Sequence, residues 1–366
     1  MTFSSADQHY MQRALHLAEQ GIFSTDPNPS VGCVFVKNNE IIAEGWTQPA
    51  GDLHAEASAI KNATSVLVGT DCYVTLEPCS HHGKTPPCAN ALIACGIKRL
   101  VVALEDPNPQ VAGRGIELIK QAGITVEIGL FAEAAEILIR GFSKRMQTGL
   151  PFVTLKMGMS MDAKTAMASG ESQWITAPES RHQVQRLRAK SSAVITGKQT
   201  VISDNPAMIV RVTELPVTVQ SKLLRQPIRV VLDSNRSLTG TERIFNLDEH
   251  YLWVSLNHPD AANDKYITLA SNSTGKIDLQ ELLSKLGAME MNEVLVEAGA
   301  EVSGAVISAN WVDEIQLFMA PVILGHEARD LIQLPGMTQL SDKKKFEFVS
   351  ANASGPDVQL VFRRGN

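Results

Sequence analysis

The residues His54-Ala55-Glu56, followed by Pro78-Cys79 and then by Cys88, decide how the first part of this chain folds and what it binds. One histidine and two cysteines supply three zinc ligands and leave the fourth tetrahedral position open for water, as in catalytic zinc sites. The glutamate is not needed as a ligand, so its carboxylate is free to move protons. The stretch therefore predicts a catalytic zinc site held by His54, Cys79 and Cys88, with Glu56 as the acid–base residue.

The order of these elements is typical of zinc-dependent nucleobase deaminases, but the spacing of the cysteines departs from their pattern. Eight residues, Ser80 to Pro87, separate Cys79 from Cys88 where the usual motif has two. This insertion must lie beside the metal. A structural zinc site is the alternative, with His81 or His82 as a fourth ligand. The joint occurrence of the histidine–glutamate and proline–cysteine elements, in this order, favours the catalytic interpretation.

Length and composition narrow the class of protein. A chain of 366 residues suits two domains, and 44% hydrophobic with 20% charged residues is ordinary for a globular protein. The net charge of -6 argues against nucleic acid as a partner. Five cysteines without a recognisable export signal fit reduced thiols and metal ligands better than disulfides. Since no apolar run is long enough to cross a membrane, we expect a cytoplasmic protein without membrane contact.

Strands and helices alternate along the first part of the chain, which predicts a mostly parallel sheet covered on both faces. We expect strands at 31–36, 40–46, 71–77, 100–104 and 124–128, with a hairpin joining the first two. We expect helices at 7–20, from about 54, at 87–96, 115–121 and 131–146. The turn at 148–151 marks the domain boundary, so the first domain is 1–149 and the second is 150–366.

One short sequence occurs twice in the first domain. Asp26-Pro27-Asn28-Pro29 recurs as Asp106-Pro107-Asn108-Pro109, each time in a rigid loop at the boundary of a strand. The two loops could form two rims of one pocket, in which the asparagine amides read a base. The alternative is that both are turns stiffened by proline.

The second part follows the same α/β pattern. We expect strands at 152–157, 193–196, 227–233, 252–254, 293–296 and 314–319, a helix at 178–190, a functional loop at 160–176, and surface connections at 212–226 and 255–275. Val294 to Gly304 runs from a strand through a glycine turn into a helix at 305–309, and such a turn can present backbone N–H groups to a phosphate. It is neither a G-x-G-x-x-G fingerprint nor a P-loop, so a plain strand-to-helix turn remains the alternative.

Taken together, these residues resemble the bifunctional deaminase–reductase family of riboflavin biosynthesis over nearly the whole chain. The matching segments are Thr75 to Cys88, Pro27 to Gly32, Asp106 to Pro109, Ser169 to Thr176, Thr200 to Arg211, and Glu297 to Gly299. The resemblance implies an α/β fold: a cytidine-deaminase-like α/β/α domain followed by a dihydrofolate-reductase-like α/β domain. The implied first reaction is hydrolytic deamination of 2,5-diamino-6-(5-phosphoribosylamino)pyrimidin-4-one with Zn²⁺. The implied second reaction reduces the ribosyl group of the product, 5-amino-6-(5-phosphoribosylamino)uracil, to ribityl with NADPH.

The resemblance also implies roles for individual residues. In the deaminase, the substrate would be contacted by Asn28, His81, Lys84, Asp106 and Asn108, with Lys84 suited to the phosphate. In the reductase, NADPH would lie against Gly158, Trp174, Thr200, Asp204, Ser234 and Gly299. The second substrate would be lined by Lys156, Ser172, Arg188, Met208, Arg211 and Glu297, with the two arginines suited to its phosphate and Lys156 and Glu297 near the reduced carbon.

A few positions depart from the family pattern. Thr47 stands where a histidine expected to touch the substrate is usual, and Pro49 where an arginine is usual. The threonine hydroxyl can still donate a hydrogen bond but reaches less far. Ala163 replaces a usual glycine and Met208 a usual leucine.

Two other functions compete with the bifunctional one. A deaminase of free nucleosides or tRNA bases with an accessory domain would bind RNA in a salt-dependent way. A non-catalytic protein stabilised by zinc would unfold its first domain on chelation. We expect small phosphorylated pyrimidines as substrates, no nucleic acid partner, and a homo-oligomer.

Overall fold

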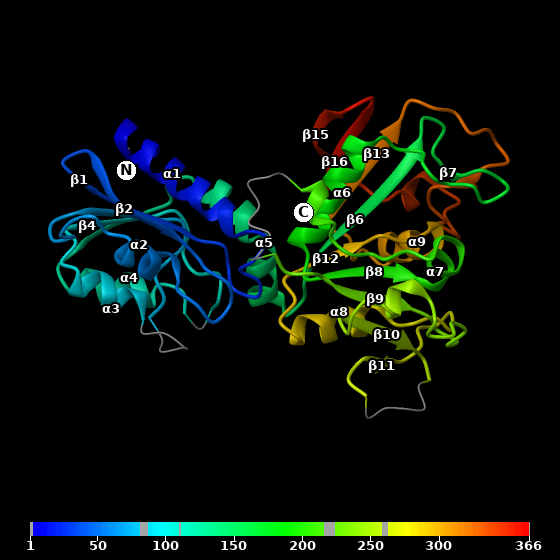
Figure 1. The fold of residues 1–366 in the computed structure, drawn as a ribbon, viewed down its shortest axis with the longest axis horizontal. Coiled ribbons are helices and arrows are strands. Elements are labelled where there is room, and N and C mark those ends of the chain that lie inside the picture. The colour runs from blue at the N-terminus through cyan, green and yellow to red at the C-terminus, as the bar shows by residue number, and fades with distance from the viewer. Residues whose placement is uncertain (1–2, 81–86, 110, 216–223, 258–262, 366) are drawn as a thin grey trace. The chain divides into compact units, whose positions relative to one another are not determined.

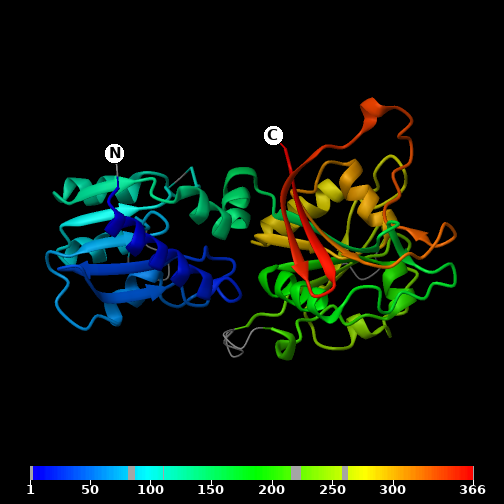
Figure 2. The same cartoon turned by 90° about the horizontal axis from the view of Figure 1, so that it is seen from above.

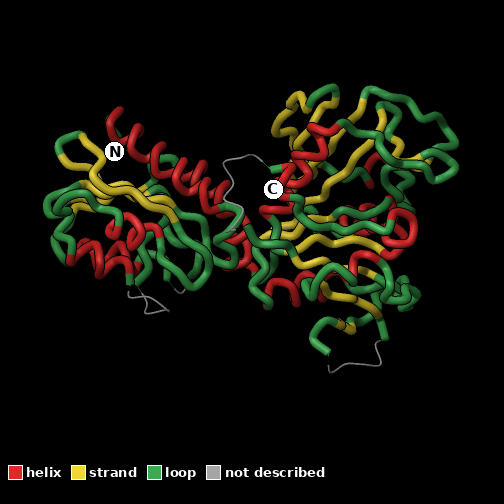
Figure 3. Tube along the Cα trace, viewed as in Figure 1, coloured by secondary structure: helices red, strands yellow, loops and turns green. Residues whose placement is uncertain are grey.

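The computed structural model describes residues 3–80, 87–109, 111–215, 224–257 and 263–365 (Figure 1). The chain forms two compact units, with the division between Leu150 and Pro151. Figure 3 shows the strands of each unit, in yellow, flanked by helices, in red. Among the described residues, no helix has both the length and the apolar character needed to cross a membrane.

The first unit is a five-stranded sheet between helices, and its elements agree with the prediction apart from small differences at their ends. In chain order they are α1 Ser5–Gly21, β1 Gly32–Lys37, β2 Glu40–Trp46, α2 Ala55–Lys61, β3 Asp71–Val74, α3 Cys88–Ala94, β4 Arg99–Val102, α4 Arg114–Gln121, β5 Thr125–Ile128 and α5 Ala132–Thr148. The strand order is β2-β1-β3-β4-β5.

The expectation of a mostly parallel sheet holds for four of the five strands of this unit, and β1 is the exception. β3, β4 and β5 run parallel, but β1 is antiparallel to both β2 and β3. The cause is the hairpin between β1 and β2, whose turn residues Asn38 and Asn39 have φ of 53° and 65°. Two consecutive residues of positive φ match the twist of a two-residue hairpin, and asparagine tolerates that conformation. The sheet is therefore mixed.

Both faces of this sheet are buried, as predicted. Phe35 of β1 belongs to a core cluster that includes Leu92 of α3, whereas its neighbour Val34 belongs to a cluster that includes Met11 of α1. Successive side chains of a strand point to opposite faces, so two helical layers can each bury one set. Figure 1 shows α1 on one side of the sheet and α2, α3 and α4 on the other. This arrangement places the starts of α2 and α3 beside the end of β3.

The second unit contains a larger sheet. Its elements are β6 Phe152–Ser160, β7 Lys164–Ala166, α6 Pro178–Lys190, β8 Ala193–Gly197, α7 Lys198–Asp204, β9 Ile228–Leu232, β10 Tyr251–Ser255, β11 Tyr266–Thr268, α8 Leu279–Ala288, β12 Glu293–Val296, α9 Ala300–Ser308, β13 Glu314–Ala320, β14 Arg329–Asp330, β15 Phe346–Ser354 and β16 Asp357–Arg364, with short 3₁₀ turns between some of them. The order in the nine-stranded sheet is β11-β10-β9-β8-β12-β6-β13-β16-β15. Its strands are parallel except β16, which is antiparallel to both neighbours.

Several expectations for the second unit need correction. The connection at 255–275 contains a strand, β11, which pairs with β10; the other connection, 212–226, lies partly outside the described residues. The helix expected at 305–309 begins at Ala300, directly after the glycine turn. Other elements that were not predicted include β7, α7, β14, α8, and the β15–β16 hairpin that forms one edge of the sheet (red in Figure 2).

Candidate active sites

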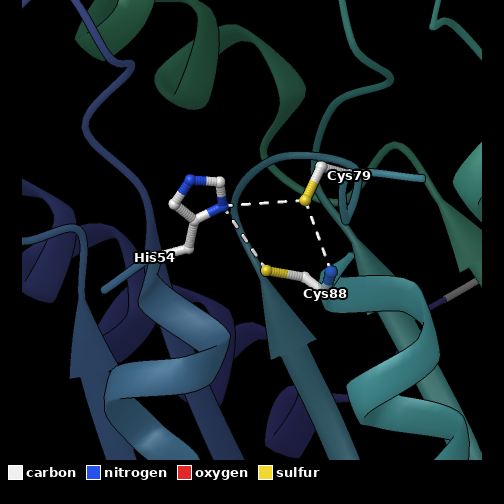
Figure 4. Close-up of side chains that lie close together, drawn as sticks. All are labelled: His54, Cys79 and Cys88. Atoms are coloured by element: carbon white, nitrogen blue, oxygen red, sulfur yellow. Dashed lines mark hydrogen bonds between the residues drawn. The ribbon is translucent and has the colours of Figure 1, made fainter. Parts of the chain in front are cut away.

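Three predicted zinc ligands meet in the first unit. His54 is the N-cap residue of α2, Cys79 follows β3, and Cys88 is the first residue of α3. Nδ1 of His54 lies 3.6 Å from Sγ of Cys79 and 3.5 Å from Sγ of Cys88, and the Cys88 backbone N–H donates to Sγ of Cys79 at 3.3 Å (Figure 4). The structure therefore brings together ligand atoms from three elements that are separate in the sequence.

These distances fit a zinc ion. Zinc–sulfur bonds of about 2.3 Å and zinc–nitrogen bonds of about 2.0 Å in a tetrahedron separate ligand atoms by roughly 3.5 Å. All three ligand atoms lie within 4.8 Å of one another, and among the described residues they form a three-member group. His81 and His82, the possible fourth ligands of a structural site, lie outside the described residues. The described geometry suits three protein ligands with one open position.

The pKa shifts of the two cysteine thiols also favour a bound cation at this site. The hydrogen bond from Cys88, together with His54, lowers the pKa of Cys79 to about 4, against the opposing effect of burial. The neighbouring Cys79 and burial raise the pKa of Cys88 far above its usual value. Two thiols this close cannot readily both ionise unless a positive charge compensates them, and a divalent ion supplies that charge.

Glu56 lies beside the ligands in the first turn of α2 and is 4% exposed. Burial, and then the charge of Cys79, raise the pKa of Glu56 to about 7. A carboxyl group whose pKa is near neutrality can both accept and donate a proton at physiological pH. The geometry therefore agrees with an acid–base residue at this position.

Asn28, Asp106 and Asn108, which were predicted to contact the deaminase substrate, lie in loops. Asn28 is in the turn after α1, where its backbone N–H donates to Thr25. Asp106 and Asn108 share one loop, in which the Asn108 N–H donates to the Asp106 carboxylate at 2.8 Å. His81 and Lys84 lie outside the described residues. That the two loops form rims of one pocket stays a prediction.

The hydroxyl of Thr47 is used for structure. Thr47 is 3% exposed, and its Oγ1 accepts the Val31 N–H at 3.1 Å and lies 3.5 Å from the Val31 carbonyl. This hydroxyl is therefore already engaged with the backbone of Val31 in this structure. The hydroxyl holds the loop that carries Asn28, because Val31 closely follows that loop in the chain.

In the second unit, a cleft of about 2030 Å³ collects every residue predicted around NADPH and the second substrate. Its walls come from β6, the loop before α6, α6 itself, α7, and the segments that follow β9 and β12. Ligands of parallel α/β sheets bind outside the carboxyl ends of the strands, where these segments lie. The predicted cleft residues are Lys156, Gly158, Ser172, Trp174, Arg188, Thr200, Asp204, Met208, Arg211, Ser234, Glu297 and Gly299.

Both arginines that were predicted to bind the substrate phosphate are engaged with carboxylates. Nε and Nη2 of Arg188 donate to the two oxygens of Glu297 at 2.6 and 2.9 Å, and this pair is largely buried. Burial opposes ionisation of Glu297, but Arg188 outweighs it and holds the pKa of Glu297 below its usual value. Arg211 binds Glu214 in the same two-pronged way at 2.5 and 2.9 Å, near the surface. A phosphate bound by both prongs of either guanidinium would have to replace a carboxylate.

Lys156 and Gly158 face the cleft from one side of β6. The amine of Lys156 lies 4.0 Å from the position that a Cβ atom on Gly158 would take. Burial, and then the charge of Arg188, lower the pKa of Lys156, against the opposing charge of Glu297. A side chain at residue 158 would enter the space next to this amine.

The structure adds two residues that the sequence interpretation passed over. Arg181 of α6 lies 4.8 Å from the ring centre of Trp174, which is 67% exposed in the cleft, so the guanidinium can hold the ring by a cation–π contact. Glu77, inside the motif that precedes Cys79, is 4% exposed and accepts several backbone N–H groups. The sequence signal that could have identified Glu77 was a charged residue shortly after a buried strand.

Comparison with known proteins covers both units. Residues 151–360 match the model of the RibD C-terminal domain, and residues 4–104 match that of the cytidine and deoxycytidylate deaminase zinc-binding region. The chain is 47% identical to riboflavin biosynthesis protein RibD of Escherichia coli K12, over 97% of this chain and 98% of that protein.

Two solved structures share the whole arrangement of elements. The structure of Acinetobacter baumannii RibD is 40% identical, covers 99% of each chain and superposes with a TM-score of 0.91. The diaminohydroxyphosphoribosylaminopyrimidine deaminase/5-amino-6-(5-phosphoribosylamino)uracil reductase of Thermotoga maritima is 33% identical, covers 98% of this chain and 99% of that one, and has a TM-score of 0.87. These similarities do not favour a deaminase of nucleosides or tRNA bases, because they extend through the second unit.

Proposed function

The chain belongs to the bifunctional deaminase–reductase family of riboflavin biosynthesis, and from this membership we propose which of its residues perform the two reactions. It is a zinc-dependent deaminase of 2,5-diamino-6-(5-phosphoribosylamino)pyrimidin-4-one. It is also an NADPH-dependent reductase that converts the ribosyl group of 5-amino-6-(5-phosphoribosylamino)uracil to ribityl.

The spacing of three ligand atoms beside a buried glutamate is the observation that supports the deaminase assignment most. His54, Cys79 and Cys88 would hold the zinc ion, which when bound supplies activation of a water molecule. Glu56 takes a proton from the attacking water and gives it to the departing amine. Such acid–base help is worth roughly 10²–10⁴-fold in rate.

Loops around the zinc site would orient the pyrimidine. Asn28, Asp106 and Asn108 are proposed to contact the base through their amide and carboxylate groups. His81 and Lys84 complete this set, with Lys84 on the phosphate; a lysine offers a point charge that suits this group. Fixed polar groups lower the entropic cost of bringing the amine to the reacting water.

In the reductase, NADPH supplies the hydride and the protein positions the two partners. Gly158, Trp174, Thr200, Asp204, Ser234 and Gly299 are proposed to surround the cofactor. Ser172 and Met208 would line the substrate, with Lys156 and Glu297 near the carbon that is reduced. This assignment is supported by the gathering of these side chains in one cleft.

Arg188 and Arg211 are proposed to bind the substrate phosphate. Each is now paired with a carboxylate, so a phosphate bound by both prongs of either guanidinium would have to displace that partner. Arg211 can exchange at little cost, because a salt bridge near the surface is worth about 0–1 kcal/mol. Arg188 keeps a buried partner, so we expect it to act on phosphate and on Glu297 together.

We also propose a cytoplasmic location and a homo-oligomer. None of the five cysteines forms a disulfide, and the sulfur atoms of Cys33 and Cys72 lie 3.6 Å apart as a hydrogen-bonded pair, which suits a reducing compartment. Exposed Phe348 and Val349 on the edge strand β15 offer apolar surface that a second copy could cover. Light scattering on the purified chain measures the number of subunits.

A mass-spectrometric assay tests the two activities and their order. With the diamino substrate, we expect loss of the amine without NADPH, and a gain of two hydrogens after NADPH is added. Reduction of the substrate before deamination, or deamination that requires NADPH, would contradict the proposed sequence of steps.

A further inference from the structure

Glu77 lies two residues before the zinc ligand Cys79, and its carboxylate accepts hydrogen bonds from four backbone N–H groups. Each carboxylate oxygen accepts two N–H groups. Oε2 accepts from Asp106 at 3.1 Å and Gly113 at 2.9 Å, and Oε1 accepts from Gly115 at 2.8 Å and Ile116 at 3.2 Å. A carboxylate has about four acceptor positions, so all of them are occupied.

The donors of Glu77 come from both ends of one loop. The loop that begins with the second Asp-Pro-Asn-Pro repeat donates to the Glu77 carboxylate from both of its ends. The donor at its start is the Asp106 N–H, and the donor at its end is the Gly113 N–H, just before α4. Two further donors, Gly115 and Ile116, lie in the first turn of α4, where helical N–H groups lack a partner within the helix. A negative charge is also favoured at this end of a helix. Glu77 thus closes the loop and joins it to the helix.

Backbone packing reinforces this connection. A Cβ atom on Gly115 would lie 2.0 Å from the carbonyl oxygen of Pro78, so α4 approaches the residue before Cys79 as closely as a glycine permits. The loop with Asp106 and Asn108 is therefore held directly against the segment that carries a zinc ligand.

The segment before Cys79 also binds the chain that follows the first repeat, but here the binding side chain is the neutral hydroxyl of Thr75. Oγ1 of Thr75 accepts the Gly32 N–H at 3.1 Å, and the Thr75 N–H donates to the Gly32 carbonyl at 3.1 Å. Gly32 closely follows Asp26-Pro27-Asn28-Pro29. Thr75 and Glu77 thus connect the two repeats to one stretch of chain, and the buried carboxylate makes the larger number of bonds.

We propose that Glu77 is a positioning residue of the deaminase: it sets the place of Asp106 and Asn108 relative to the zinc site. This inference rests on the proposed role of these two residues as substrate contacts. Glu77 touches neither substrate nor zinc in this account. It acts through the loop, so its effect falls on substrate binding and leaves the metal in place.

The test compares Glu77→Gln with Glu105→Gln in the full-length, zinc-loaded chain. Glutamine keeps the shape but replaces one acceptor oxygen with an NH₂ group that faces two N–H donors. We expect the deaminase KM to rise about tenfold or more, with one zinc per chain and unchanged reductase kinetics. Glu105 is exposed and adjacent to Asp106, so the same chemical change there should leave all of these values as they are. A KM within twofold of the original, or a loss of activity that follows loss of zinc at constant KM, would overturn the proposal.

Two further measurements separate the inference from the function on which it rests. If Asn108→Ala leaves KM unchanged, the loop does not bind substrate and the proposed contacts fail. If Asn108→Ala raises KM and Glu77→Gln does not, only the positioning role fails. Hydrogen exchange on the unaltered protein needs no variant to fold: we expect the amides of Asp106, Gly113, Gly115 and Ile116 to exchange at least about 10²-fold slower than unprotected amides. Unprotected amides there would overturn the proposal.

Discussion

The two units build their sites in different ways. In the first, the catalytic and metal-binding residues are few and lie at the starts of α2 and α3 and after β3. A short sequence motif is therefore enough to identify them. In the second, the cleft is assembled from residues spread between Lys156 and Pro335, and no single motif identifies it. The difference follows from the task. A small ion needs three ligands at fixed distances, whereas a dinucleotide and a sugar phosphate need a long wall of contacts.

Glu56→Gln should produce the largest effect and should separate the two units. We expect deamination to fall by roughly 10²–10⁴-fold, because the variant cannot take up a proton from water. Zinc content and reduction of the deaminated substrate should stay at the original level. Mass spectrometry of each product and metal analysis measure these quantities. A Glu56→Gln protein with full deaminase activity would remove the residue from the mechanism.

Arg188→Ala should damage the second unit in both stability and binding. Removing this partner leaves the Glu297 carboxylate buried and unpaired, which costs about 3–5 kcal/mol of unfolding free energy. Arg211→Ala removes a pair near the surface and should cost about 0–1 kcal/mol. Denaturant unfolding of the second unit measures both.

The same two variants test the phosphate assignment. We expect each to raise the reductase KM while leaving deamination unchanged. If neither variant changes this KM, the two arginines do not bind the phosphate.

The pH dependence of the reductase should carry a signature that the deaminase lacks. Burial lowers the pKa of Lys156 from the usual value of about 10.4, so its ammonium loses a proton at a lower pH than a free lysine does. If the charged form assists reduction, kcat/KM is full below the lowered pKa and falls as pH rises through it. Lys156→Arg stays charged and should lose this alkaline limb. An identical limb in that variant would assign it to another group.

Ala163→Gly should have the smallest effect, and it should stabilise. Ala163 has a φ of 58°, a conformation that costs an L-residue roughly 1 kcal/mol and costs glycine almost nothing. The larger freedom of glycine in the unfolded chain offsets part of the gain, so we expect a net increase below about 1 kcal/mol. Calorimetry should show a small rise in the melting temperature of the second unit only. A fall would show that the alanine methyl group makes favourable contacts.

Local chemistry made much of the first unit predictable. Ser4 and Asp7 form a capping box where α1 begins, and two asparagines turn the chain between β1 and β2. Both signals lie within a few residues of the structure that they specify. In the second unit, α8 carried a comparable signal in Leu282, Leu283 and Leu286, which share its buried face. β15 carried almost none, because most of its side chains are exposed.

What could not be predicted was which distant groups would meet. Arg188 and Glu297 are 109 residues apart, and neither sequence position shows that they would pair. The Glu77 carboxylate finds donors in backbone N–H groups, which every residue except proline carries and which no sequence pattern marks. Thr47 is a further example, because the sequence does not show that its hydroxyl accepts a hydrogen bond from the Val31 backbone N–H.

Removal of zinc tests the central claim most directly, namely that one chain carries two sites with separate requirements. The chelated protein should lose deamination and recover it when zinc is restored, since His54, Cys79 and Cys88 leave an open position for catalysis. It should keep reducing 5-amino-6-(5-phosphoribosylamino)uracil with NADPH throughout. Deamination that persists without zinc, or reduction that falls in step with zinc content, would contradict the account.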